Sequence, residues 1–273
     1  MADALTPRGP DSAGYWSDPE HAIALAHRRL AIIEPSETGH QPMMSASGRY
    51  VISFNGEIYN HLDLRDQLSI GGSKQITWKG RSDTETLITG IETWGLKKTL
   101  RKSIGMYAFA LWDRAERALY LVRDRIGEKP LYYGYQQGVF LFSSELKALK
   151  AHPAFEGEID RNAITLQLRH SYIPTPYSIY KGIRKLPPGT FIKLHVRNGR
   201  LSGSEPEPVS YWSFRDAISN GRANPFNGSD SDAVGTLDSL LSDAIRQQMV
   251  ADVPLGAFLS GGVDSSTIVA LMQ

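Results

Sequence analysis

Two groups of residues, far apart in the 273-residue chain, have the types and spacing of ligand-binding sites. The first group lies in the N-terminal half and contains Arg29, the pair Asn55-Gly56 and Asp83. A free amino acid needs a guanidinium for its α-carboxylate, a carboxylate for its α-ammonium, and amide or backbone donors around its reacting carbonyl. These residues supply that set, so together they predict a site for an amino acid.

Each residue of this first group also has an ordinary structural explanation. Asn-Gly is the strongest hairpin signal, so Asn55-Gly56 is compatible with a type I′ turn. Asp83 is compatible with a helix cap, and Arg29 with a solvated strand residue. Caps, turns and surface arginines greatly outnumber ligand contacts, so only the combination favours a binding site.

The second group is a glycine- and serine-rich run near the C-terminus, Ser260-Gly261-Gly262-Val263-Asp264-Ser265-Ser266. It lies between residues 253–259, an apolar run typical of a buried parallel strand, and residues 267–272, which suit a helix. Paired glycines allow successive N–H groups to converge on an anion at a helix N-terminus, and the three serines add hydroxyl donors.

This run is not a Walker A loop, because no Lys follows the glycines at the required position. A Gly-rich turn with a Ser or Asp cap is the alternative explanation, but the complete strand, turn and helix pattern favours a pyrophosphate grip of a nucleotide site. Asp264 is a candidate ligand for the Mg²⁺ that accompanies ATP, because a carboxylate is a hard oxygen ligand.

The elements that must position the first group are mostly strands. Short apolar runs separated by Gly, Asn, Asp and Pro predict a strand-rich domain, with strands at residues 23–26, 30–33, 50–54, 107–112, 119–123 and 139–142. Helices are expected at residues 62–68 and 144–150. Another is expected from Ser82 onward, where Ser82 and Glu85 have capping-box spacing.

Composition predicts two domains joined by a linker. Residues 200–230 are rich in Ser, Gly, Pro, Asn and Glu, and residues 232–250 carry apolar side chains at helical spacing. We therefore expect a first domain at 1–205, a linker at 206–230 anchored by Tyr211-Trp212, and the beginning of a second domain at 231–273.

The bulk composition excludes several classes of protein. Thirty Lys and Arg against 29 Asp and Glu leave a net charge of +1, which does not suggest nucleic acid or an acidic membrane surface as a partner. No apolar run reaches the roughly 18 residues of a membrane-spanning helix. The chain has no cysteine, which removes disulfides, thiolate metal sites and thiol nucleophiles. We expect a soluble cytoplasmic protein whose partners are small molecules.

The order of the motifs resembles that of the glutamine-hydrolysing asparagine synthases, which join a class II glutaminase domain to an ATP-pyrophosphatase-type synthetase domain. The resemblance runs from Arg8 to the last residue and rests on Arg8–Asp11, Asn55–Asn60, residues 105–110 and 123–132, and Leu259–Ser266. It implies an α+β domain followed by an α/β domain. The first is an αββα sandwich of the N-terminal-nucleophile type, and the second opens with a helix, a strand and a phosphate-binding turn.

The resemblance also implies an activity and the residues that serve it. Glutamine is hydrolysed in the first domain, and the ammonia passes to the second, where ATP activates aspartate for conversion to asparagine. Carried over to this sequence, Arg29 binds the glutamine α-carboxylate, Asp83 binds its ammonium, Asn55 and Gly56 form the oxyanion hole, and Glu57 lines the pocket. Phe258 contacts the nucleotide through its backbone, and Ser260–Ser266 grip the pyrophosphate. Residues 123–132 and 186–189 are assigned to the scaffold, with Arg125 and Lys129 as surface or interdomain pairs.

The sequence departs from the family pattern at the nucleophile. Family members use an N-terminal cysteine, whereas here Met1 is followed by Ala2 and no catalytic cysteine is present. We expect truncation at both ends rather than a variant that has lost glutaminase activity, because the glutamine ligands are retained. The chain alone is then expected to be inactive. A related amidotransferase that acts on another carboxylate, and a non-catalytic glutamine-binding module, are the alternatives; a homodimer is also compatible.

Overall fold

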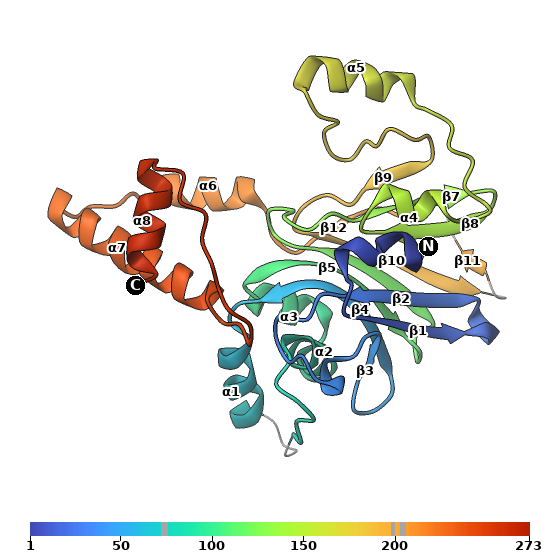
Figure 1. The fold of residues 1–273 in the computed structure, drawn as a ribbon, viewed down its shortest axis with the longest axis horizontal. Coiled ribbons are helices and arrows are strands. Elements are labelled where there is room, and N and C mark those ends of the chain that lie inside the picture. The colour runs from blue at the N-terminus through green and yellow to red at the C-terminus, as the bar shows by residue number, and fades with distance from the viewer. Residues whose placement is uncertain (72–75, 198–199, 203–205) are drawn as a thin grey trace.

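The computed structural model describes residues 1–71, 76–197, 200–202 and 206–273 (Figure 1). The expected end of the first domain at residue 205 lies outside these described residues. The strands are β1 (Ser12–Asp18), β2 (Ile23–Arg29), β3 (Met43–Met44), β4 (Tyr50–Ile58), β5 (Gly105–Asp113), β6 (Ala118–Arg123), β7 (Tyr132–Gln136), β8 (Val139–Ser143), β9 (Ile183–Lys185), β10 (Thr190–Arg197), β11 (Arg200–Ser202) and β12 (Val209–Ser210). The helices are α1 (His61–Gly71), α2 (Asp83–Trp94), α3 (Leu96–Lys102), α4 (Leu146–Lys150), α5 (Arg161–His170), α6 (Phe214–Ala223), α7 (Asp230–Gln248) and α8 (Val263–Leu271).

A seven-stranded antiparallel sheet forms the centre of the molecule. Its strand order is β11-β10-β6-β5-β4-β3, with β12 paired to β10. Strand β4 pairs with β5 over its whole length, from Tyr50 opposite Asp113 to Ile58 opposite Gly105. The strand expected at 50–54 is therefore confirmed, and it continues through Asn55 and Gly56. The hairpin-turn explanation for these two residues is wrong, because both take part in the β4–β5 ladder.

Helices α1, α2 and α3 cover one face of this sheet. Their apolar side chains pack with the even-numbered residues of β4, from Tyr50 to Ile58, in a buried cluster. Ser82 is the N-cap of α2, and its Oγ accepts a hydrogen bond from the N–H of Glu85 at 3.1 Å. The Glu85 carboxylate accepts from the N–H groups of Lys79 and Gly80 instead of closing a capping box with Ser82.

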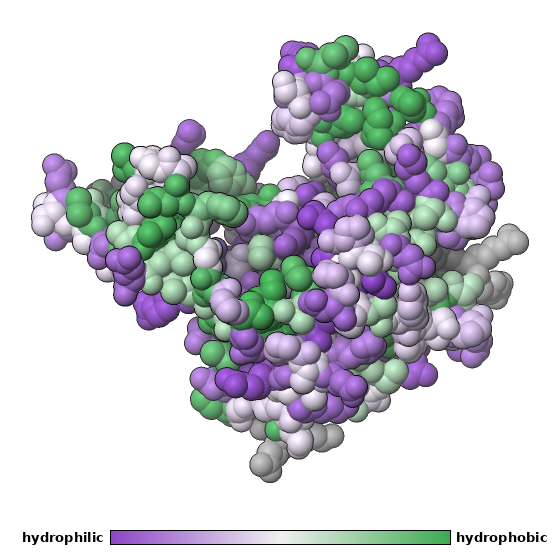
Figure 2. Space-filling model, viewed as in Figure 1, coloured by the Kyte–Doolittle hydropathy of each residue, from purple (hydrophilic) through white to green (hydrophobic). Residues whose placement is uncertain are grey.

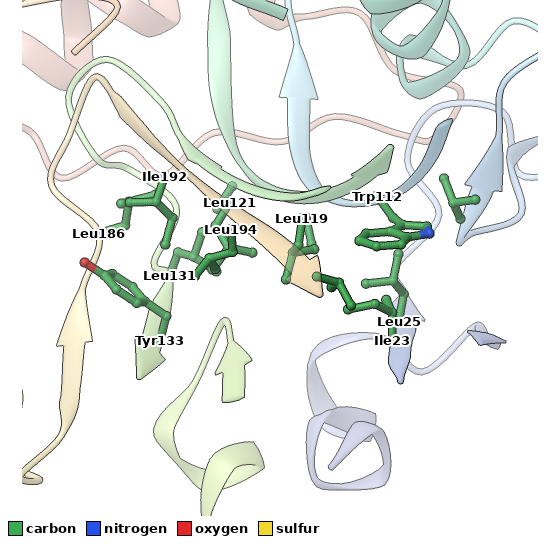
Figure 3. Close-up of a cluster of buried hydrophobic side chains, with 14 residues drawn as sticks. Ile23, Leu25, Trp112, Leu119, Leu121, Leu131, Tyr133, Leu186, Ile192 and Leu194 are labelled. Carbon is green, nitrogen blue, oxygen red and sulfur yellow. The ribbon is translucent and has the colours of Figure 1, made fainter. Parts of the chain in front are cut away.

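A second β layer covers the opposite face of the sheet. It consists of the hairpin β1–β2 and the three-stranded sheet β8-β7-β9. Figure 3 shows Leu121 and Leu194 of the large sheet beside Leu131, which directly precedes β7. The same buried cluster includes Leu25 of β2. Helix α4 packs on the outer side of β8, so the layers are helix, sheet, sheet and helix. The αββα prediction is confirmed.

The strand expected at residues 30–33 does not form. The chain leaves the β1–β2 hairpin after Arg29, and the backbone carbonyls of Ile33, Glu34 and Ser36 turn toward the Arg29 guanidinium. A side chain that gathers three carbonyls from the segment following it bends that segment into a loop. Glu34 has a φ of 56° in this loop, which is a left-handed conformation and incompatible with a strand.

The C-terminal part differs from the prediction in two places. Residues 206–230, expected as a linker, include strand β12 and helix α6, and the anchor Tyr211 is buried beside Gly189 and Arg123. Residues 253–259, expected as a buried strand, form no strand and are largely exposed. A strand needs a neighbour for its backbone N–H and C=O groups, and none of the described strands pairs with this segment.

The helices expected in this part are present. Helix α7, expected at residues 232–250, runs from Asp230 to Gln248, and α8 begins at Val263, directly after the paired glycines. Apolar side chains gather on the surface over α5 and over α7 and α8 (Figure 2), where Leu168 and Val263 are more than four-fifths exposed. Among the described helices, none is long and apolar enough to cross a membrane.

Candidate amino-acid site and phosphate turn

A cavity of about 930 Å³ lies between the two β layers. It receives side chains from the hairpin β1–β2, from β4 and β5, from the start of α2 and from the segment before β7. All five residues expected to bind glutamine line it: Arg29, Asn55, Gly56, Glu57 and Asp83. The structure therefore brings together residues that are as many as 54 positions apart in the sequence.

Strand alternation in β4 decides which side chains enter the cavity. Ile58 packs with the helices, whereas Val51 packs toward the second β layer, so Asn55 and Glu57 share the face of Val51. Nδ2 of Asn55 donates to Oγ of Ser144 at 3.3 Å. Gly56 presses against β5, since a Cβ at this position would lie 2.2 Å from the carbonyl oxygen of Met106. Any larger residue there would push the two strands apart.

Two carboxylates, Asp83 and Glu57, meet at the end of β4. Asp83 is the first residue of α2, and its Oδ2 accepts from the N–H of Ile58 at 2.9 Å. Burial raises the pKa of Asp83 to about 6, against the opposing effect of its hydrogen bonds from Ile58 and Thr84. The cap explanation for Asp83 is wrong, because Ser82 holds that position.

Glu57 is the less well-paired of the two carboxylates. Burial, followed by the neighbouring charge of Asp83, raises the pKa of Glu57 to about 7, while Lys129 acts in the opposite direction. Its Oε1 is buried and has no hydrogen-bond partner. A buried carboxylate without a partner is costly when ionised, so this position favours a cationic donor from a ligand.

The third charged group of the cavity is the guanidinium of Arg29, which is only 9% exposed. Nη1 donates to the carbonyl of Ser36 at 3.0 Å, and Nη2 donates to the carbonyls of Ile33 and Glu34. Burial lowers the pKa of Arg29, and the charges of Glu34, Asp11 and Asp83 oppose that effect. The solvated-strand explanation is wrong. The loop carbonyls also engage both Nη atoms, so a ligand carboxylate has to share them.

Several residues that line the cavity were not predicted for it. Lys129 was expected to form a surface or interdomain pair, but it is partly buried, lines the cavity and lowers the pKa of Glu57. Arg125, for which the same was expected, does not line the cavity; it is partly buried and donates to the carbonyls of Arg101 and Ser103 near the end of α3. His27 lines the cavity too, and burial, Arg29 and His40 lower the pKa of its imidazole to about 4. His27 lies two residues before Arg29 in β2, so strand alternation could have placed both side chains on the cavity face.

The phosphate turn, Ser260–Ser266, is formed at the beginning of α8. The hydroxyls of Ser260 and Ser265 lie 3.0 Å apart, and Gly261 has a φ of 81°. A left-handed φ at this point is what a paired-glycine turn into a helix requires. Phe258 and Asp264 are exposed, and neither they nor the serines line the cavity between the β layers.

The phosphate turn offers few donor atoms to a metal ion. Among the described residues, no group of three or more His, Cys, Asp or Glu side chains converges as a complete set of metal ligands. Asp264, in the first turn of α8, is a single hard oxygen donor beside the turn. Mg²⁺ commonly binds through one or two carboxylates together with substrate phosphates, and this donor set fits that mode.

The chain is similar to known proteins along its whole length. Residues 1–211 match the glutamine amidotransferase domain family, and residues 236–273 match the asparagine synthase family. "Asparagine synthetase [glutamine-hydrolyzing] 3" of Bacillus subtilis is 35% identical over 99% of this chain and 41% of its own length. "Putative asparagine synthetase [glutamine-hydrolyzing] 2" of Methanocaldococcus jannaschii is 33% identical over 100% of this chain and 53% of its own. This chain therefore spans about half, or less, of the curated relatives it matches.

A solved structure supports the fold. Glutamine phosphoribosylpyrophosphate amidotransferase from B. subtilis matches with a TM-score of 0.51 and 18% identity, over 77% of this chain and 45% of that one. At this level of identity the likeness concerns the fold alone.

Proposed function

The chain belongs to the glutamine amidotransferase domain family, whose model matches residues 1–211, and on that premise we propose that the cavity between its β layers binds glutamine. The observation that carries the proposal is the pair formed by the buried carboxylate of Asp83 and the half-buried carboxylate of Glu57, whose buried Oε1 has no hydrogen-bond partner. The α-ammonium of glutamine would donate to this pair and neutralise it. A neighbouring positive charge lowers the pKa of both carboxyls and so favours their ionised forms.

The remaining polar groups would hold the rest of the substrate. Arg29 would bind the α-carboxylate by sharing its Nη donors with the loop carbonyls that now accept them. Asn55 and Gly56 would donate to the side-chain carbonyl oxygen as negative charge develops on it during hydrolysis. No cysteine is present among the 273 residues to act as nucleophile, so binding and orientation are the parts of the reaction that we assign to this chain.

We propose that Phe258 and the phosphate turn contribute to an ATP site. The helix N-terminus and the hydroxyls of Ser260, Ser265 and Ser266 would bind phosphate oxygens, with Asp264 as the protein's ligand to Mg²⁺. When bound, ATP would supply the activation of an acceptor carboxylate. Relatives of the chain are named glutamine-hydrolysing asparagine synthetases. We therefore propose aspartate as the acceptor and asparagine as the product, with glutamine as the source of the nitrogen.

Calorimetric titration of the full chain with L-glutamine at pH 8 tests the glutamine site. We expect saturable binding that Asp83→Asn weakens by at least about tenfold, because a charge-assisted hydrogen bond is replaced by a neutral one. Asparagine keeps an acceptor oxygen for the N–H of Ile58, so the start of α2 is retained. Asp243→Asn, on the exposed surface of α7, is the matched control. Absence of saturable binding to the unsubstituted chain would contradict the proposal.

A further inference from the structure

Glu34, in the loop after β2, makes contacts in three directions. Its N–H donates to Oδ2 of Asp252 at 2.8 Å, and its carbonyl accepts from Nη2 of Arg29. Its carboxylate accepts from the N–H of Arg81, just before α2, at 2.8 Å. One residue thus connects the C-terminal segment, the cation of the cavity and the segment that carries Asp83.

The contact with the C-terminal segment has two hydrogen bonds. Besides the bond from Glu34 to the Asp252 carboxylate, the N–H of Asp252 donates to the carbonyl of Ile32 at 3.0 Å. The two bonds fix both the backbone and the side chain of Asp252 against the loop. Asp252 follows α7 and precedes the phosphate turn, so the loop that holds Arg29 is attached to the part of the chain proposed to bind ATP.

The backbone of Glu34 depends on such contacts. Its φ of 56° is left-handed, a conformation that costs free energy for a residue other than glycine and persists where the surroundings hold it. The contacts with Asp252, Arg29 and Arg81 are those surroundings. We therefore expect the loss of one of them to relax the loop toward ordinary φ values and to displace the carbonyl that accepts from Arg29.

We propose that Asp252 is a positioning residue for glutamine, acting through Glu34 on the guanidinium of Arg29. The proposal rests on the proposed glutamine site, where Arg29 binds the α-carboxylate. Asp252 itself touches no substrate. It holds the loop in the conformation in which Arg29 faces the cavity, and so links the arrangement of the C-terminal segment to glutamine affinity.

The test compares glutamine affinity with stability in the full chain. Asp252→Ala removes the acceptor for the Glu34 N–H, and we expect glutamine to bind about three- to tenfold more weakly, as for the loss of one ordinary hydrogen bond, since the effect reaches glutamine only through the loop. Asp252→Asn keeps an acceptor oxygen and should restore most of the affinity. Asp243→Ala is the control. Amide exchange at Glu34, followed by NMR, should be faster in Asp252→Ala alone, with the melting temperature close to that of the unsubstituted chain.

The possible results separate this inference from the proposed function. Weaker glutamine binding in Asp252→Ala, with rescue by Asp252→Asn, supports the positioning role. Equal affinity in Asp252→Ala and the unsubstituted chain overturns it while leaving the glutamine site intact, and so does equal weakening in the Asp243→Ala control. If the unsubstituted chain binds no glutamine, the proposed function fails and the inference fails with it.

Discussion

Replacement of Glu57 by Gln should have opposite effects on ligand binding and on stability. Glu57 lies on the cavity face of β4, with its Oε1 buried and unpartnered, and burial raises the pKa of its carboxyl to about 7. The substitution keeps the shape of the side chain but removes its charge. An unpaired carboxylate that binds a cationic ligand should lower the stability of the free protein and increase its affinity for that ligand.

The effect on binding follows from competition between a proton and the glutamine ammonium. With a pKa of about 7, Glu57 is roughly nine-tenths ionised at pH 8 and one-tenth ionised at pH 6, so glutamine should bind about tenfold more weakly at pH 6. Asp83, with a pKa of about 6, adds about a further twofold loss. Glu57→Gln should weaken glutamine binding at pH 8 by about 10- to 100-fold. The affinity of this variant should retain only the smaller pH dependence that is due to Asp83.

The effect on stability has the opposite sign. Because folding raises the pKa of Glu57 from its ordinary value near 4.5 to about 7, the folded chain binds the proton more tightly than the unfolded chain. That stabilisation is complete below the unfolded pKa and is lost as the pH rises through 7. The full shift corresponds to ~3 kcal/mol, which solvent screening at this partly exposed site reduces to about 1–2 kcal/mol. Glu57→Gln should therefore melt about 2–6 °C higher at pH 8, and close to the unsubstituted chain at pH 4.5.

Thermal unfolding between pH 4.5 and 8.5, together with glutamine calorimetry at pH 6 and 8, measures both effects. The exposed Glu207→Gln is the matched control and should change neither. A lower melting temperature for Glu57→Gln at pH 8 would refute the argument that the carboxylate is strained by burial. An unchanged glutamine affinity would refute its role in binding the ammonium.

Two glycine substitutions, each with a control, test the cavity and the phosphate turn. Gly56→Ala places a Cβ 2.2 Å from the Met106 carbonyl, so urea unfolding should show a loss of about 1–3 kcal/mol, whereas Gly221→Ala in α6, which meets nothing within 4 Å, should be neutral or stabilising. Equal losses in both would contradict the packing argument. Gly261→Ala should weaken Mg²⁺–ATP binding by about fivefold in a titration, because alanine resists a φ of 81°, while Gly256→Ala, whose φ is not left-handed, should not. Identical ATP affinities in the two variants would count against the turn as the phosphate site.

Local sequence patterns predict a strand-rich first domain and its candidate site residues to a useful extent, whereas the αββα arrangement follows from the resemblance to a known family. Alternation along residues 50–54 predicts a half-buried strand, and the same alternation continued three residues further places Asn55 and Glu57 on one face. Ser82 and Glu85 predict where α2 starts, and the N–H of Glu85 does bond to Ser82. The charges of Arg29 and Asp83 alone indicate which side chains could bind the α-carboxylate and the α-ammonium of an amino acid.

The parts that the sequence does not predict depend on distant partners. Residues 30–33 have strand-like composition, but the Arg29 side chain and Asp252, more than 200 positions away, determine their loop conformation. Lys129 belongs to a segment that looks like scaffold, and only its position opposite Glu57 brings it to the site. Residues 253–259 have the apolar run of a buried strand, but pairing depends on neighbours that a local pattern does not contain.

The nine residues of β4 contribute to the apolar core on each face of the large sheet and to the cavity. Their even positions fill the core under the helices, and their odd positions supply Asn55 and Glu57 to the cavity. A slip of one residue against β5 would drive the carboxylate of Glu57 into the apolar core and turn Ile58 toward the cavity. A misregistered chain therefore loses its proposed glutamine ligands together with its packing. Glutamine-induced stabilisation can consequently serve as a reporter of correct strand pairing during refolding, one that distinguishes the native sheet from compact states of similar secondary structure.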